Sequence, residues 1–95
     1  MIDGVYINEL KQFVDERGKV MHMLRSDSSL FSRFGEVYFS VINPGVVKAW
    51  KKHSKMTQHI AVPVGRVRLV IYDDRRDSRT YGSLENIETG EDMYL

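Results

Sequence analysis

Cysteine is absent from this 95-residue sequence, and proline occurs only twice. Without cysteine there can be no disulfide, no thiolate nucleophile and no thiolate metal site, and a reducing, intracellular setting fits this composition. No stretch approaches the roughly 20 apolar residues that a membrane-spanning helix needs. The N-terminus also lacks a basic leader followed by an apolar run. We therefore expect a soluble, cytoplasmic protein without a membrane partner.

A surplus of positive charge is missing too, because 14 basic and 13 acidic residues leave a formal net charge of +1. Nucleic-acid-binding proteins usually carry a clear basic excess on one face, so we expect no nucleic-acid partner. The apolar content of 42% and the charged content of 28% are ordinary for a globular protein. The length suits one compact domain, which we predict over residues 1–95.

Short segments rich in Val, Ile, Tyr and Phe alternate with turn residues along the chain. Segments of four to eight such residues at this spacing predict an all-β sandwich or barrel. The turns agree, since "DERG" ends in a glycine that can adopt positive φ and "NPG" and "PVG" combine proline with glycine. The predicted strands are residues 4–7, 19–25, 36–42, 46–50, 59–64, 66–73 and 84–89.

One short helix is predicted near residues 27–34. Residues 26–28 are Ser-Asp-Ser, each of which favours a helix N-cap, and Gly35 is typical of a helix end. Three apolar residues at helical spacing would then cover one edge of the sheet. They are Leu30, Phe31 and Phe34.

The last predicted strand is followed only by "GEDMYL". An uncovered edge strand invites pairing with another chain. We therefore expect either that a second copy of the chain supplies the missing partners or that the polypeptide is part of a longer one.

The segment "WKKHSKMTQH" combines cations with two histidines. On a strand, alternate residues share a face, so Lys51 and His53 would stand side by side. If that face lines a barrel interior, burial would lower both pKa values and make either residue a usable base near neutral pH. If the face is solvated, both are ordinary surface groups, and a lysine-rich strand end is more often a solubilising edge.

Metal and phosphate ligands can both be considered for this segment. His53 and His59 lie on either side of a turn, yet no nearby carboxylate joins them and the lysines would repel a cation, so no metal site is predicted. Phosphate groups instead favour several cationic donors that converge on one cleft. The candidate donors are Arg25, Lys48, Lys51, Lys52 and Lys55.

The order of the motifs resembles a known family. "DERG", "PGVVKAW", "KMT" and "VRLVIYDDR" followed by "SRTYG" are similar, in order and spacing, to the N-terminal part of the dTDP-4-dehydrorhamnose 3,5-epimerases, over Ile7 to Leu95. The resemblance implies a double-stranded β-helix of the cupin or jelly-roll type, incomplete here and completed by dimerisation. It further implies a homodimer that acts without cofactor or metal on a nucleoside-diphosphate 4-keto-6-deoxysugar, with a dTDP-sugar expected.

The resemblance also assigns the catalytic base. The family motif Trp-His-x-His reads Trp50-Lys51-Lys52-His53 here, so Lys51 occupies the base position and His53 keeps the second histidine. A carbon acid next to a ketone needs only a positioned base and a group that stabilises the enolate oxygen. In the family a tyrosine from the later half of the chain returns the proton, and no tyrosine of this sequence falls on that position.

Five residues are predicted to bind substrate through the same resemblance. Lys48 matches an Arg or Lys that faces the diphosphate, and Arg25 matches an arginine that contacts nucleotide phosphate. Gln58 stands where relatives place a charged residue, and a neutral amide cannot tune a neighbour's pKa by charge. Trp50 and His59 complete this set.

The sequence leaves three hypotheses. The leading one is an epimerase of a nucleotide-linked keto-sugar that serves deoxysugar and cell-surface polysaccharide synthesis. The alternative is a catalytically silent or truncated cupin that binds a sugar nucleotide or only dimerises, and Lys51 at the usual histidine position favours it. The third, a metal-dependent cupin using His53 and His59, has the least support.

Overall fold

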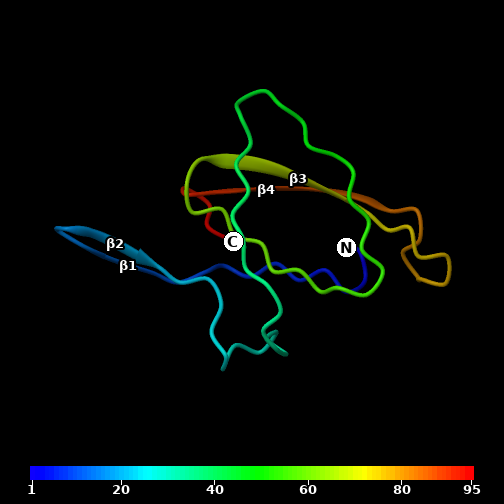
Figure 1. Cartoon of the computed structure of the whole chain (residues 1–95), viewed down its shortest axis with the longest axis horizontal. Helices are drawn as coiled ribbons and strands as arrows, with labels where there is room; N and C mark the ends of the chain where they lie inside the picture. Colours follow the sequence, from blue (N-terminus) through cyan, green and yellow to red (C-terminus); the bar gives the residue numbers. More distant parts are fainter. The chain divides into compact units, whose positions relative to one another are not determined.

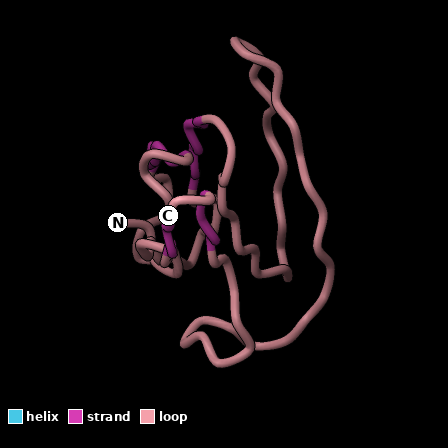
Figure 2. The backbone as a smooth tube through the Cα atoms, turned by 90° about the vertical axis from the view of Figure 1, so that its left-hand side faces the viewer, coloured by secondary structure: helices cyan, strands magenta, loops and turns pink.

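The computed structural model describes residues 1–95, and its regular structure consists of four β-strands and no helix (Figures 1 and 2). The strands form two separate antiparallel sheets of two strands each. The all-β class predicted from the sequence is therefore confirmed, whereas the jelly-roll arrangement stays a prediction. No helix of sufficient length and apolarity to cross a membrane is present.

The first sheet is a hairpin in which β1 (Gln12–Asp15) pairs with β2 (Gly18–Met21). Its turn is the predicted "DERG", and Gly18 adopts a φ of +143° there. The Asp15 carboxylate accepts a bond of 2.8 Å from the backbone N–H of Arg17 and one of 2.7 Å from its guanidinium. The side-chain bond from Arg17 is the main reason that the pKa of Asp15 is lowered.

The second sheet pairs β3 (Arg66–Tyr72) with β4 (Leu84–Gly90) over seven residues. Exposed and half-buried residues alternate along β3, so its apolar Val67, Leu69 and Ile71 share the less exposed face. Both strands were predicted from their β-type composition, and both are confirmed.

Gly90 lies where the end of β4 passes closest to the start of β3. A Cβ atom at this position would overlap the Gly65 carbonyl oxygen and lie 3.0 Å from the Arg66 Cα. We expect Gly90→Ala to lower the free energy of unfolding by about 1–3 kcal/mol, because backbone must move to accommodate the methyl group. Urea denaturation measures this, with Gly35→Ala as the control, since a Cβ at Gly35 meets nothing within 4 Å. Equal midpoints for the two variants would contradict the close approach.

The chain divides into two compact units. The first unit consists of residues 1–23 and 60–95 and contains both sheets, and the second unit consists of residues 24–59. Within the second unit the predicted "NPG" turn is confirmed, because the Val46 N–H donates to the Asn43 carbonyl at 3.1 Å and Gly45 has a φ of +78°.

Four predicted strands do not form in this structure. β-type composition favours an extended backbone, but a strand also needs a partner in register to complete its hydrogen-bond ladder, and these segments have none. The strand β1, in contrast, was not predicted, because "QFVD" has a mixed composition that only its pairing with β2 makes regular. The strands that do not form are residues 4–7, 36–42, 46–50 and 59–64.

The helix predicted near residues 27–34 is wrong. Two successive turns stand in its place, in which Ser28 donates to the Arg25 carbonyl and Phe31 donates to the Ser28 carbonyl, both at 3.0 Å. The Ser28 hydroxyl also accepts a bond from the Arg25 N–H. Serine and aspartate favour such local bonds as readily as they cap helices, so the same residues stabilise turns here.

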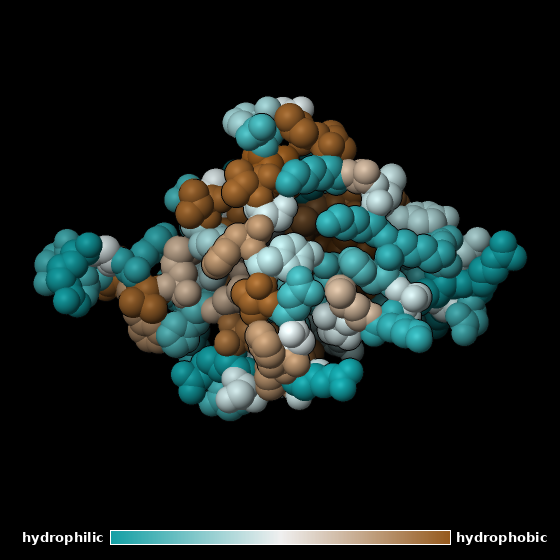
Figure 3. All heavy atoms as spheres, in the orientation of Figure 1, coloured by the Kyte–Doolittle hydropathy of each residue, from teal (hydrophilic) through white to brown (hydrophobic).

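Few apolar side chains are buried. Ile2 and Tyr94 are the buried hydrophobic residues, whereas Phe39 is 90% exposed and Val47 is 85% exposed. Figure 3 shows apolar residues, in brown, at the surface among the polar ones. Apolar residues of the kind that a closed barrel would bury are therefore exposed in this structure.

Candidate functional site

All residues predicted for catalysis and substrate binding belong to the second unit, and all are exposed. They come from the turn after β2 and from the segment that follows the "NPG" turn. They are Arg25, Lys48, Trp50, Lys51, His53, Gln58 and His59.

Lys48 is held across the "NPG" turn. Its ammonium donates to the Val41 carbonyl at 2.6 Å and to the Ser40 hydroxyl at 3.2 Å. Lysine side chains have many rotamers, so two bonds to the opposite arm of the turn restrict this one. The charge is thereby fixed at a defined place on an exposed surface.

Arg25 forms an ion pair with Asp27. The bonds from its guanidinium to the two carboxylate oxygens measure 2.8 Å and 3.1 Å, and the side-chain bond to Asp27 raises the pKa of Arg25. Because the pair is exposed, it adds little stability and can open at low cost.

The predicted catalytic groups are not linked by polar contacts in this structure. No hydrogen bond or ion pair joins Lys51, His53, Gln58 and His59 to one another, and no three His, Cys, Asp or Glu side chains are placed to hold one metal ion. Trp50 is 65% exposed. The roles assigned to these residues therefore stay predictions.

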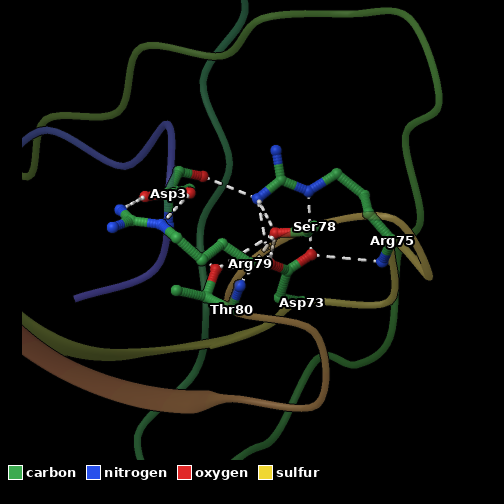
Figure 4. A network of polar contacts seen from close by, with 6 residues as sticks. All are labelled: Asp3, Asp73, Arg75, Ser78, Arg79 and Thr80. Atoms are coloured by element: carbon green, nitrogen blue, oxygen red, sulfur yellow. Dashed lines mark hydrogen bonds and ion pairs between the residues drawn. The ribbon is translucent and has the colours of Figure 1, made fainter.

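The most connected polar group lies in the first unit, in the loop between β3 and β4 (Figure 4). The Asp73 carboxylate, whose side chain is 1% exposed, accepts bonds of 2.8 Å and 2.9 Å from the Arg75 guanidinium. It also accepts bonds of 2.6 Å from the Ser78 hydroxyl and 2.7 Å from the Thr80 hydroxyl. These donors, Arg75 above all, hold the pKa of Asp73 far below its usual range. We call these four residues the Asp73 network.

The Asp73 network is bonded to the N-terminal segment through Asp3. The Arg75 guanidinium donates to the Asp3 carbonyl at 2.6 Å, and the Asp3 N–H donates to the Thr80 hydroxyl at 3.0 Å. Arg79 adds an ion pair of 2.6 Å to the Asp3 carboxylate. The buried Asp73 carboxylate is engaged by these donors on both oxygens, so this group stabilises the loop.

Sequence reasoning described "DDRRDS" as a polar loop and missed this network. Its signal is an Asp at a strand end followed by Arg, Ser and Thr at two, five and seven residues. Such residues favour local side-chain to backbone bonds in turns. A shallow surface depression also lies in the first unit, lined by Glu9, Leu10, Lys11 and Gln12, and it contains none of the predicted site residues.

Two curated proteins are similar to this chain over nearly its whole length. The "Spore coat polysaccharide biosynthesis protein SpsL" of Bacillus subtilis is 38% identical over 92 residues, which cover 97% of this chain and 61% of that protein. The "Probable low-salt glycan biosynthesis epimerase Agl13" of Haloferax volcanii is 38% identical over 92 residues, which cover 95% of this chain and 59% of that protein.

The chain thus spans about three fifths of the length of the curated relatives that it matches. No family model matches it, and no solved structure matches it. The names of the two relatives connect them with polysaccharide and glycan biosynthesis, and the second relative is named a probable epimerase.

Proposed function

We propose that this chain acts in polysaccharide or glycan biosynthesis as an epimerase of a nucleoside-diphosphate 4-keto-6-deoxysugar. The similarity to two relatives with these names, over at least 95% of the chain, is the observation that carries the proposal. The motif order that resembles the dTDP-4-dehydrorhamnose 3,5-epimerases supports the choice of a keto-sugar, with a dTDP-sugar as the first candidate.

The proposed chemistry is proton removal next to the ketone. Lys51 or His53 accepts the proton from a carbon beside the carbonyl, and the electron pair moves onto the carbonyl oxygen to give an enolate. A neighbouring cation stabilises that oxygen. Return of a proton to the opposite face of the carbon inverts its configuration, and the chemistry needs no metal or other cofactor.

The proposed site belongs to one cupin-type domain over residues 1–95, whose jelly roll is completed by a second copy of the chain. The exposure of Phe39 and Val47 supports this arrangement, because a closed barrel would cover apolar residues of this kind. Trp50, Gln58 and His59 line the sugar-nucleotide pocket in this arrangement.

Lys48 and Arg25 contact the diphosphate in this proposal. We expect Lys48→Ala to weaken the binding of dTDP by about tenfold, because a charge-assisted bond to phosphate is lost. Isothermal titration calorimetry measures the dissociation constant, and Lys19→Ala, which removes an exposed lysine of the first unit, is the control. Equal dissociation constants for Lys48→Ala and the unchanged chain would exclude Lys48 from the site.

Turnover is tested by incubating the chain with dTDP-4-keto-6-deoxyglucose in deuterated water. An epimerase transfers solvent deuterium to the sugar, so mass spectrometry should show a mass increase. No increase at high protein concentration would contradict the epimerase. Binding of dTDP without exchange would favour the second candidate, a catalytically silent cupin that binds a sugar nucleotide. Lys51 at the usual histidine position also favours this candidate.

A further inference from the structure

Ser40 contacts Lys48, the lysine that is held across the "NPG" turn of the second unit. Its hydroxyl lies 3.2 Å from the Lys48 ammonium, and the neighbouring Val41 carbonyl lies 2.6 Å from the same nitrogen. Ser40 is exposed, and no role has so far been assigned to it.

The hydrogen-bond donors that this contact leaves unused indicate which kind of ligand could bind here. An ammonium only donates hydrogen bonds, so the Ser40 hydroxyl must accept from Lys48, and it keeps its own O–H as a donor. Lys48 has three N–H donors, of which Val41 and Ser40 engage two. One N–H and one O–H, on atoms 3.2 Å apart, are therefore left for a further acceptor.

The "NPG" turn positions these two donors before any ligand arrives. The turn is closed by the bond of 3.1 Å from the Val46 N–H to the Asn43 carbonyl, and Gly45 has the positive φ of +78° that it requires. Two arms joined in this way keep Ser40 opposite Lys48. Donors held in place lose less entropy when they bind a ligand.

The charge around this pair favours an anion. Residues 37–59 contain four lysines and neither aspartate nor glutamate. No acidic side chain of this segment therefore competes for the two free donors. The acceptor that fits one ammonium and one hydroxyl donor in a cationic segment is a phosphate group.

We propose that Ser40 is a phosphate-binding residue that donates its hydroxyl proton to the same phosphate that Lys48 contacts. The inference rests on the proposed function, since the phosphate is the diphosphate of the sugar nucleotide. The inference adds Ser40 to the residues that bind the diphosphate. In this arrangement the Val41 carbonyl orients Lys48, and Ser40 and Lys48 bind the ligand.

Calorimetric titration with dTDP and with inorganic pyrophosphate tests this proposal. We expect Ser40→Ala to weaken the binding of both ligands by about five- to tenfold, the effect of one hydrogen bond to a charged group. Ser40→Thr keeps a hydroxyl and should bind within about twofold of the unchanged chain. Ser29→Ala, an exposed serine of the same unit that makes no hydrogen bond, is the matched control.

The possible outcomes separate this proposal from the function on which it rests. Unchanged affinity in Ser40→Ala, while Lys48→Ala weakens binding, overturns the role of Ser40 and leaves the function standing. Affinity as weak in Ser40→Thr as in Ser40→Ala also overturns it. A thermal midpoint that falls in Ser40→Ala with no change in affinity assigns Ser40 a structural role only. If the unchanged chain binds neither ligand, both proposals fail.

Discussion

Replacement of the catalytic base is expected to lower the rate of epimerisation by about 10²–10⁴-fold, the range that general base catalysis contributes. The two variants are Lys51→Met and His53→Gln, and the large loss should occur in the one that removes the proton acceptor. Initial rates of deuterium incorporation into the sugar measure the effect. The dissociation constant for dTDP should change little in either variant, because the proposed function gives the diphosphate contacts to Lys48 and Arg25.

Lys19→Met is the control for this pair, since it removes an exposed lysine that is not among the candidate phosphate donors. Its rate should match that of the unchanged chain. Wild-type rates in both Lys51→Met and His53→Gln would show that the base is neither residue.

Asp73→Asn is expected to lower the thermal midpoint of unfolding by about 10 °C. The Asp73 carboxylate accepts bonds from Arg75, Ser78 and Thr80 and is almost fully shielded from solvent. An amide has one acceptor oxygen in place of two, so the Arg75 guanidinium would lose one of its hydrogen-bond acceptors and the negative charge beside it. Circular dichroism during heating measures the midpoint.

Asp92→Asn is the matched control for Asp73→Asn. Asp92 forms an exposed ion pair of 3.3 Å with Arg66, so its loss should shift the midpoint by at most about 2 °C. Equal midpoints for the two variants would contradict the central place of the Asp73 network in the stability of the first unit.

Acid should weaken the same network. Because the folded chain holds the pKa of Asp73 below its unfolded value, this carboxylate stabilises the fold above the unfolded pKa of about 4. The contribution is lost as the pH falls from there toward the folded pKa. Asp3, whose pKa is lowered mainly by its bond from Arg79, acts in the same direction. The thermal midpoint should therefore decrease when the pH is lowered below about 4. The decrease should be smaller in Asp73→Asn.

Local sequence signals predicted the parts of this fold that local chemistry determines. The strands β3 and β4 follow from runs of β-branched and apolar residues, and the turns at Gly18 and Gly45 follow from the positive φ that glycine permits. The helix near residues 27–34 failed because Ser and Asp serve both helix caps and turns.

Contacts between distant residues could not be predicted in the same way. The bond between Asp3 and Thr80 joins residues 77 positions apart, and nothing in either neighbourhood marks the other. The contact between Ser40 and Lys48 depends on how the "NPG" turn folds back. The family motif identified Lys51 and His53 as candidate bases, but a motif does not determine the position of a base relative to its substrate.

Nuclear magnetic resonance of the sugar after incubation in deuterated water tests the central proposal most directly. The substrate is dTDP-4-keto-6-deoxyglucose, and the carbons to inspect are those next to the ketone, C3 and C5. The account predicts deuterium at one or both of these carbons, and its loss in the variant that lacks the base. A sugar that keeps both protons while dTDP binds with measurable heat would contradict the epimerase.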